Sequence, residues 1–147
     1  LRVEALRGVG RRDEAIADVD RALATHPEAP FYRLRGQLYL DDGNPKAAIP
    51  FLEQAATMSP HHFQTYSLLV RAYAAAGRKA DADRTSVRVE EIRRDYDLVS
   101  DLSREAMAKP WDPGVRLRLA EYFQRTGDAK LAAMWRKAAA ELQARGR

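Results

Sequence analysis

The sequence contains a pattern that recurs about every 33 residues. The clearest copy occupies residues 43–60, and a second copy occupies residues 10–27. In both copies an alanine follows the leading glycine by five residues, and a proline closes the segment seventeen residues after that glycine. Gly77 follows Gly43 by 34 residues, and Gly127 follows Gly77 by 50. A period of this length is typical of a repeat protein, in which each unit is one supersecondary element stacked on the next.

Apolar residues within the units recur at the spacing of an α-helix. In residues 13–25 they form one stripe with steps of three and four, ending before His26-Pro27. Asn44-Pro45 and Asp112-Pro113 each place a capping side chain before a proline, a combination typical of the start of a helix. The sequence therefore predicts an all-α protein, an antiparallel helix-pair solenoid with a C-terminal capping helix that begins after Asp128.

One segment departs from the repeat. Residues 79–109 contain neither glycine nor proline, and as a single helix they would be ~46 Å long at 1.5 Å per residue. Apolar positions run along this segment from Thr85 to Val99, and Leu98 and Leu102 form an adjacent edge. We expect the extended helix to overhang its own repeat, with residues 113–145 packed on its distal half.

Composition and charge narrow the classes of function. The net charge is +4, but the 25 Lys and Arg are interleaved with 21 Asp and Glu, whereas a nucleic-acid surface needs basic residues gathered on one face. The absence of cysteine excludes disulfides and cysteine-based metal or redox sites. No apolar run reaches the ~18 residues of a membrane span. The chain starts at Leu1 without a leader, so we expect a fragment truncated at its N-terminus, and the compartment stays open.

No set of residues has the pattern of a catalytic or metal site. His61-His62 would need further ligands, and His26 is the only other histidine, so we interpret the pair as a solvated turn. Residues 8–10 lack the Lys and Ser or Thr of a phosphate loop. Trp111 and Trp135 are interpreted as core or junction anchors. The sequence therefore predicts no enzyme, no metal and no cofactor.

The spacing resembles the tetratricopeptide repeat, a 34-residue pair of antiparallel helices. The matching positions in the second unit are Tyr32, Gly36, Tyr39, Gly43, Ala48, Leu52, Ala55 and Pro60. The resemblance implies a right-handed superhelix in a single domain over residues 1–147. Its parts would be a partial repeat at 1–27, a repeat at 28–60, a repeat with a long second helix at 61–109, and a divergent repeat with a cap at 110–147.

The resemblance also implies a binding surface. In such proteins the first helix of each pair lines a concave groove that holds an extended peptide or a helix. The matching positions here are Arg33, Gln37, Leu40, Asp41, Gln64, Ser67, Arg71, Ala74, Leu117 and Glu121. Some members grip a C-terminal carboxylate with groove lysines and asparagines, and that clamp is not reproduced. Arg33 and Arg71 would favour an acidic peptide through forked hydrogen bonds, the alternative being two solvated arginines.

Three functions follow from these observations. The first is a non-enzymatic interaction module, an adaptor or scaffold whose partner is a protein or peptide. The second is self-association through the long helix, with the stripe between Val89 and Leu102 pairing with a second copy. The third, which the mixed charge disfavours, is nucleic-acid binding by a helical repeat.

Overall fold

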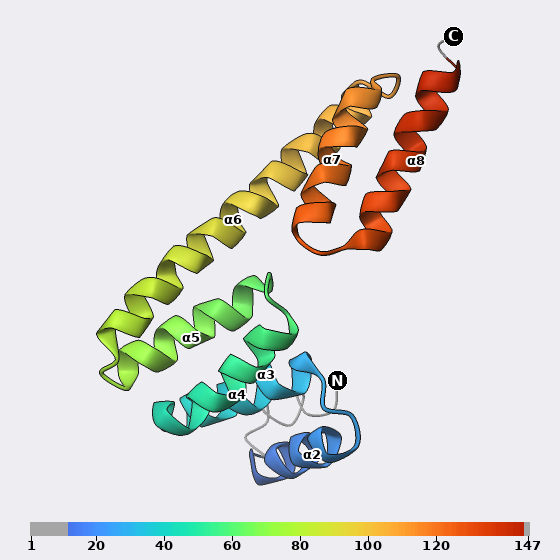
Figure 1. Cartoon of the computed structure of the whole chain (residues 1–147). Coiled ribbons are helices and arrows are strands. Elements are labelled where there is room, and N and C mark those ends of the chain that lie inside the picture. Colours follow the sequence, from blue (N-terminus) through green and yellow to red (C-terminus); the bar gives the residue numbers. More distant parts are fainter. Residues whose placement is uncertain (1–11, 146–147) are drawn as a thin grey trace. The chain divides into compact units, whose positions relative to one another are not determined.

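The computed structural model describes residues 12–145 and forms seven α-helices, with no strand in that range (Figure 1). The prediction of an all-α helical repeat is confirmed. Residues 1–11, the first part of the partial repeat expected at 1–27, lie outside the described residues. The helices are α2 (Arg12–Thr25), α3 (Ala29–Asp41), α4 (Pro45–Met58), α5 (Phe63–Ala75), α6 (Lys79–Ala108), α7 (Pro113–Arg125) and α8 (Ala129–Arg145).

Side chains that precede the helices fix where three of them begin. In each case a side-chain oxygen accepts a hydrogen bond from a backbone N–H of the first turn, which has no partner within the helix. The predicted caps at Asn44, Asp112 and Asp128 are confirmed. The bonds run from Ala47 N to Asn44 Oδ1 (3.3 Å), from Gly114 N to Asp112 Oδ1 (2.8 Å) and from Leu131 N to Asp128 Oδ1 (2.9 Å).

The recurring glycine ends the first helix of each pair. Gly43, Gly77 and Gly127 have φ values of +70°, +77° and +89°, in the left-handed region where a Cβ atom would be strained. After each glycine, the next backbone N–H bonds back to a carbonyl five residues earlier, as in Asn44 N to Tyr39 O (2.9 Å). The same reversal therefore occurs three times, and it explains the period seen in the sequence.

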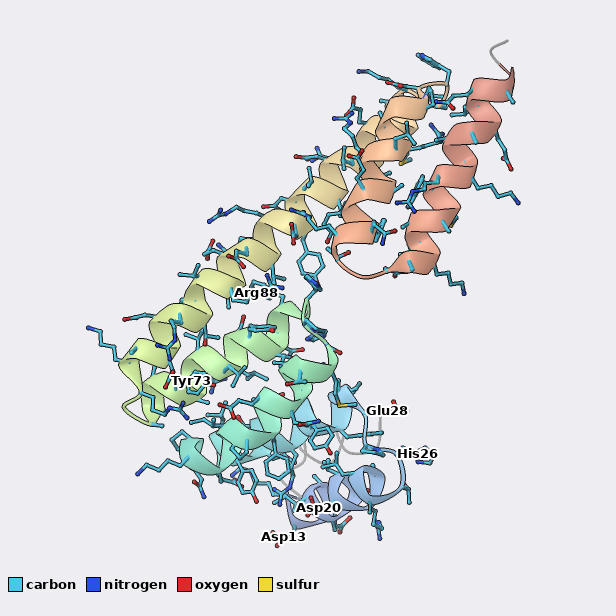
Figure 2. The ribbon with its side chains drawn as sticks, viewed as in Figure 1. Asp13, Asp20, His26, Glu28, Tyr73 and Arg88 are labelled. Carbon is cyan, nitrogen blue, oxygen red and sulfur yellow. The ribbon has the colours of Figure 1, made fainter. Side chains whose placement is uncertain are left out.

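The chain forms two compact units, Leu1–Ile92 and Arg93–Arg147, and the boundary falls inside α6. In the first unit, polar side chains connect successive helices (Figure 2). The Tyr73 hydroxyl on α5 donates to Glu53 Oε1 on α4 at 2.6 Å. Arg88 Nη2 on α6 donates to the carbonyl of Pro60, between α4 and α5, at 3.0 Å. These hydrogen bonds are directional, whereas the other contacts between the helices are mainly apolar.

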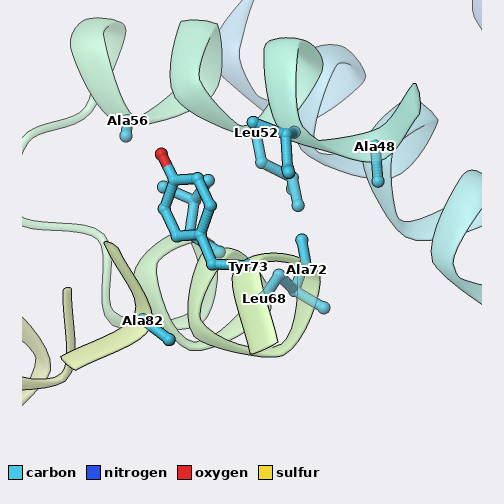
Figure 3. Packing of buried hydrophobic residues seen from close by; sticks show 9 residues of the cluster. Ala48, Leu52, Ala56, Leu68, Ala72, Tyr73 and Ala82 are labelled. Atoms are coloured by element: carbon cyan, nitrogen blue, oxygen red, sulfur yellow. The ribbon is translucent and has the colours of Figure 1, made fainter. Parts of the chain in front are cut away.

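The core of the first unit lies between α4, α5 and the start of α6 (Figure 3). Leu52 is fully buried there, and the ring of Tyr73 reaches from α5 toward α4. On the other side of α4, a Cβ atom built on Gly36 would lie 2.5 Å from Leu52 Cγ and 3.2 Å from the carbonyl oxygen of Ala48. Only glycine fits there, so the close approach of α3 and α4 depends on Gly36.

The second unit consists of the distal part of α6 with α7 and α8. Leu102 and Ala106 of α6 pack against Val115 and Leu119 of α7, as expected, and Trp135 of α8 joins this cluster. The interpretation of Trp135 as a core anchor is thus confirmed. The same interpretation is wrong for Trp111, which is 72% exposed because it lies in the turn between α6 and α7.

Candidate functional site

Four of the predicted groove positions lie on α3. Arg33, Gln37, Leu40 and Asp41 are separated by four, three and one residues, so they share one side of the helix. Arg33, Gln37 and Leu40 are half-buried, and Asp41 is exposed. Leu40 packs against the core of the first unit. The carbonyl of Asp41 accepts a hydrogen bond from Arg12 Nη2 at 3.3 Å.

The next predicted positions lie on α5, which contacts α3 within the same unit. Gln64 and Arg71 are exposed, and Ser67 is half-buried. The Ser67 hydroxyl donates to the carbonyl of Phe63 at 3.0 Å, so its hydrogen-bonding capacity is partly used within the helix. Gln64 and Arg71 are therefore the groove positions of α5 with the most freely accessible polar groups.

His62 links the α3 positions to α5. Its Nδ1 accepts a hydrogen bond from the backbone N–H of Thr65 at 3.3 Å and caps α5, while its Nε2 lies 3.3 Å from Arg33 Nη1. Burial and the Arg33 guanidinium lower the pKa of His62. Arg88 Nη2 lies 3.2 Å from Nδ1 of the neighbouring His61. The turn expected at this pair is present between α4 and α5, but both histidines are half-buried and therefore only partly solvated.

The arginines of the first unit differ in their ionic partners. Most of those on α2 to α6 pair with a carboxylate, but Arg33 and Arg71 have no such partner among residues 12–145. The positively charged groups without a carboxylate partner therefore include both arginines at predicted groove positions. The paired arginines are Arg12 (with Asp42), Arg21 (Asp18), Arg35 (Asp20), Arg78 and Arg84 (Asp81), and Arg88 (Glu91).

A shallow hollow of about 220 Å³ adjoins one of these positions. It lies between α5 and the first part of α6, and it is mostly apolar. Ser67 is the only predicted groove residue in its lining. The remaining lining residues are Val70, Ser86, Val89 and Glu90.

The last two predicted positions lie on α7 in the second unit. Leu117 is exposed, and Glu121 lines a larger hollow of about 340 Å³ between the distal part of α6 and α7. Arg118, Tyr122 and Arg125 line the same hollow. These three residues were not predicted from the sequence, although their steps of four and three along α7 place them on one side of the helix.

Residues 12–145 contain no group of three or more His, Cys, Asp or Glu residues arranged to hold a metal ion. No helix within that range is both long and apolar enough to cross a membrane.

Comparison with protein families gives two matches. Both family models are described as tetratricopeptide repeat, one matching residues 1–63 and the other residues 39–104. Together they span residues 1–104, which contain the first two expected repeats and most of the third. A search of curated proteins finds no significant match.

Solved structures with a similar fold include several of a protein called MamA. One MamA crystal structure is 18% identical, with 98% of this chain and 95% of that chain covered and a TM-score of 0.60. MamA from Desulfovibrio magneticus RS-1, from residue 41 to its end, is 20% identical, with 96% and 71% covered and a TM-score of 0.57. A third structure, MamA MSR-1 C2, is 21% identical, with 97% of this chain and 74% of that chain covered and a TM-score of 0.56. At these identities the likeness shows the helical-repeat fold.

Proposed function

The chain belongs to the tetratricopeptide-repeat family, and from this premise we propose that it is a non-catalytic scaffold that binds an acidic peptide or protein segment. Repeats of this family support a role in protein interaction. The proposed binding surface is the side of α3 and α5 that carries Arg33, Gln37, Gln64 and Arg71. The helix pairs bury their apolar residues against each other, so this side is left for a partner.

The observation that supports the proposal is that two arginines lack a carboxylate partner within residues 12–145. Arg33 and Arg71 have no carboxylate partner among residues 12–145, whereas the other arginines of the first unit in that range do. A guanidinium without a carboxylate partner can form two parallel hydrogen bonds to an incoming carboxylate. The side-chain amides of Gln37 and Gln64 can both donate to and accept from the backbone of a bound segment.

The test is affinity capture with the full chain as bait and quantitative comparison of the captured proteins. The variant Arg33→Glu/Arg71→Glu reverses both charges and should lose partners that wild type retains. The matched control is Arg21→Glu/Arg84→Glu, which makes the same change of net charge at two exposed arginines away from the proposed surface. A list of partners that is the same for all three proteins would reject the groove proposal.

Self-association through α6 is the second candidate. Tyr96 and Leu98 are exposed on this helix, which favours it. Ile92 and Leu102, however, are 1% and 4% exposed, so the stripe from Val89 to Leu102 is only partly available to a second copy. Sedimentation over a range of concentrations decides between the two candidates, since a strict monomer rules out self-association.

A further inference from the structure

The connection between α6 and α7 carries an exposed apolar patch (Figure 1). Five consecutive residues are exposed there, from the last turn of α6 into the loop, and all but one of them are apolar. Met107 is 82% exposed and Trp111 is 72% exposed, the highest values for large apolar side chains within residues 12–145. We call this surface the turn patch. Its residues are Met107, Ala108, Lys109, Pro110 and Trp111.

The backbone holds Trp111 in a defined place. The N–H of Asp112 donates to the carbonyl of Lys109 at 3.1 Å, which closes a four-residue turn. Pro110 takes the second position of this turn, where its ring fixes the φ angle, and Trp111 takes the third. Trp111 therefore lies at the apex of a rigid turn, so little backbone freedom is lost when its side chain enters a different medium.

The first unit contains an equivalent turn. The pair α7 and α8 follows the pair α5 and α6 at an offset of 50 residues, and this offset matches residues 60–61 with residues 110–111. Each of these dipeptides begins with proline. The same bond closes the first turn, from the N–H of His62 to the carbonyl of Ser59 at 3.1 Å. The two turns can therefore be compared position by position.

The turn of the first unit is covered by an arginine. Arg88 Nη2 donates to the carbonyl of Pro60 at 3.0 Å and lies 3.2 Å from Nδ1 of His61. The residue at the position of Arg88 in the second unit is Ala138. Its single methyl group does not cover the turn, and Trp111, at the position of His61, remains exposed. The second unit thus exposes a large aromatic side chain where the first unit has a half-buried histidine.

Basic side chains lie beside the turn patch. Lys109 and Arg118 both donate to Glu105, at 3.3 Å and 2.5 Å, so two cations share one carboxylate. Arg116 Nη1 donates to the carbonyl of Asp112 at 3.0 Å, and within residues 12–145 Arg116 has no carboxylate partner. Three cations therefore stand against the two carboxylates of Glu105 and Asp112. The excess positive charge lies at the patch itself.

We propose that the turn patch inserts into the surface of a lipid bilayer that contains anionic lipids. The side chains of Trp111 and Met107 would enter the headgroup layer, and Lys109 and Arg116 would contact lipid phosphates. Tryptophan suits this layer because its ring is largely apolar while its indole N–H can still donate a hydrogen bond. The long stem of Lys109 can follow the apolar residues and keep its ammonium group among the headgroups.

The shape of the patch favours a bilayer over a folded protein. Side chains that project from a turn enter a soft lipid surface directly, whereas a folded partner needs a hollow of matching shape. One tryptophan and one methionine give weak, reversible binding, to which anionic lipids add through the basic side chains. The turn patch shares no residue with the proposed partner surface on α3 and α5, so each proposal can be tested without the other.

The test uses the full chain and vesicles made from an equal mixture of phosphatidylcholine and phosphatidylglycerol. Sedimentation of the vesicles measures the bound fraction. Bromine atoms on the acyl chains quench a tryptophan that reaches them, so quenching reports insertion. Only part of the emission should be quenched, because Trp135 packs in the core of the second unit. We expect binding to pure phosphatidylcholine to be at least about threefold weaker.

Substitutions of apolar residues locate the inserted surface. Met107→Ser/Trp111→Ser should weaken binding at least about tenfold and abolish the quenching. The matched control is Tyr96→Ser/Met134→Ser, which removes an exposed aromatic side chain and an exposed methionine of the same unit outside the patch. This control should bind within about twofold of wild type. Far-UV circular dichroism checks that both variants keep their helix content.

Substitutions of basic residues test the contribution of charge. Lys109→Gln/Arg116→Gln should weaken binding to the mixed vesicles at least about fivefold. Lys130→Gln/Arg136→Gln makes the same change of charge on α8, at two exposed residues outside the patch, and should stay within about twofold. Equal losses in these two variants would mean that the basic side chains at the patch have no special role.

Other results would overturn the proposal as a whole. They are no sedimentation with mixed vesicles at up to about 1 mM lipid, binding without quenching, or unchanged binding of Met107→Ser/Trp111→Ser. If that variant instead loses a self-association that wild type shows in analytical ultracentrifugation, and vesicle binding is unchanged, the turn patch is an interface between copies of this chain.

Discussion

Gly36 lies where the backbone of α3 meets the side chain of Leu52 on α4. Because glycine has no side chain beyond a hydrogen atom, the two helices can pack closely at this residue. A methyl group at Gly36 would overlap Leu52 and press on the carbonyl of Ala48. Gly36→Ala should therefore lower the free energy of unfolding by about 1–3 kcal/mol, although alanine is the better helix former by about 1 kcal/mol. Urea denaturation followed by circular dichroism measures the change.

The matched control for this prediction is the same substitution in a Leu52→Ala background. Removing the Leu52 side chain takes away the atoms that the new methyl group would meet, so Gly36→Ala should cost much less there. Equal costs in the two backgrounds would mean that the overlap with Leu52 is not the cause.

His62 should make the stability of the first unit depend on pH. Its pKa is lowered in the folded chain by burial and by Arg33, below the ordinary value of 6.5. The folded state thus favours the neutral ring, which accepts the bond from Thr65 N. The resulting stability is fully present above pH 6.5 and is lost as the pH falls below 6.5 through the folded pKa. Urea denaturation at a series of pH values measures this loss.

The control for the pH prediction is His62→Asn. Asparagine is a good helix cap and does not titrate, so this variant should lose less stability than wild type just below pH 6.5. The pKa values of Asp81 and Glu105 are lowered by hydrogen bonds from arginines. These two carboxylates therefore cause a loss of stability only at lower pH, and they do so in both the wild type and His62→Asn. If wild type and variant have parallel pH profiles, His62 is not the sensor.

At the scale of the element, α6 takes part in two different cores. Ile92 is buried in the first unit, and Leu102 is buried in the second. Leu102→Ala should lower the free energy of unfolding by about 2–4 kcal/mol, because it leaves a cavity beside Val115 and Leu119. Leu98→Ala, four residues away and 42% exposed, should cost less than about 1 kcal/mol. Thermal denaturation of the two variants measures the difference between their losses of stability. Similar losses for Leu102→Ala and Leu98→Ala would contradict the prediction.

The elements differ in how far the sequence could predict them. Asn44, Asp112 and the three glycines at positions 43, 77 and 127 act locally, through bonds to their own neighbours or through their own φ angle. Such features can be predicted from a short stretch of sequence, and they fixed the helix ends to within one or two residues. The buried stripes of α4 and α5 followed from helical spacing in the same way.

The remaining features depend on what lies opposite a residue in space. Helical spacing placed Ile92 and Tyr96 in one stripe, yet Ile92 is buried and Tyr96 is 52% exposed. The contact of His62 with Arg33 joins residues 29 positions apart, and no local signal predicts it. Arg118 and Arg125 became candidates only once α7 was seen beside the distal part of α6. The role of the predicted groove residues in binding a partner remains a proposal.

At the scale of the whole molecule, two compact units share one uninterrupted helix. We propose that residues 1–147 nevertheless form a single domain, because unfolding one unit would leave its half of α6 without packing. Both tryptophans, Trp111 and Trp135, belong to the second unit, whereas circular dichroism reports the helices of both. Urea transitions followed by tryptophan fluorescence and by circular dichroism should therefore coincide. Separated midpoints would show two domains that unfold independently.

The three turn glycines also have a consequence at the level of the gene. Any single-nucleotide change that replaces a glycine codon by a codon for another amino acid introduces a residue with a Cβ atom. Asparagine, which tolerates a positive φ well, is two nucleotide changes away. At Gly43, Gly77 and Gly127 nearly every accessible missense mutation therefore strains the reversal between two helices, by about 1–2 kcal/mol. Natural variation at these three codons should be sparse, even though the turns themselves are exposed to solvent.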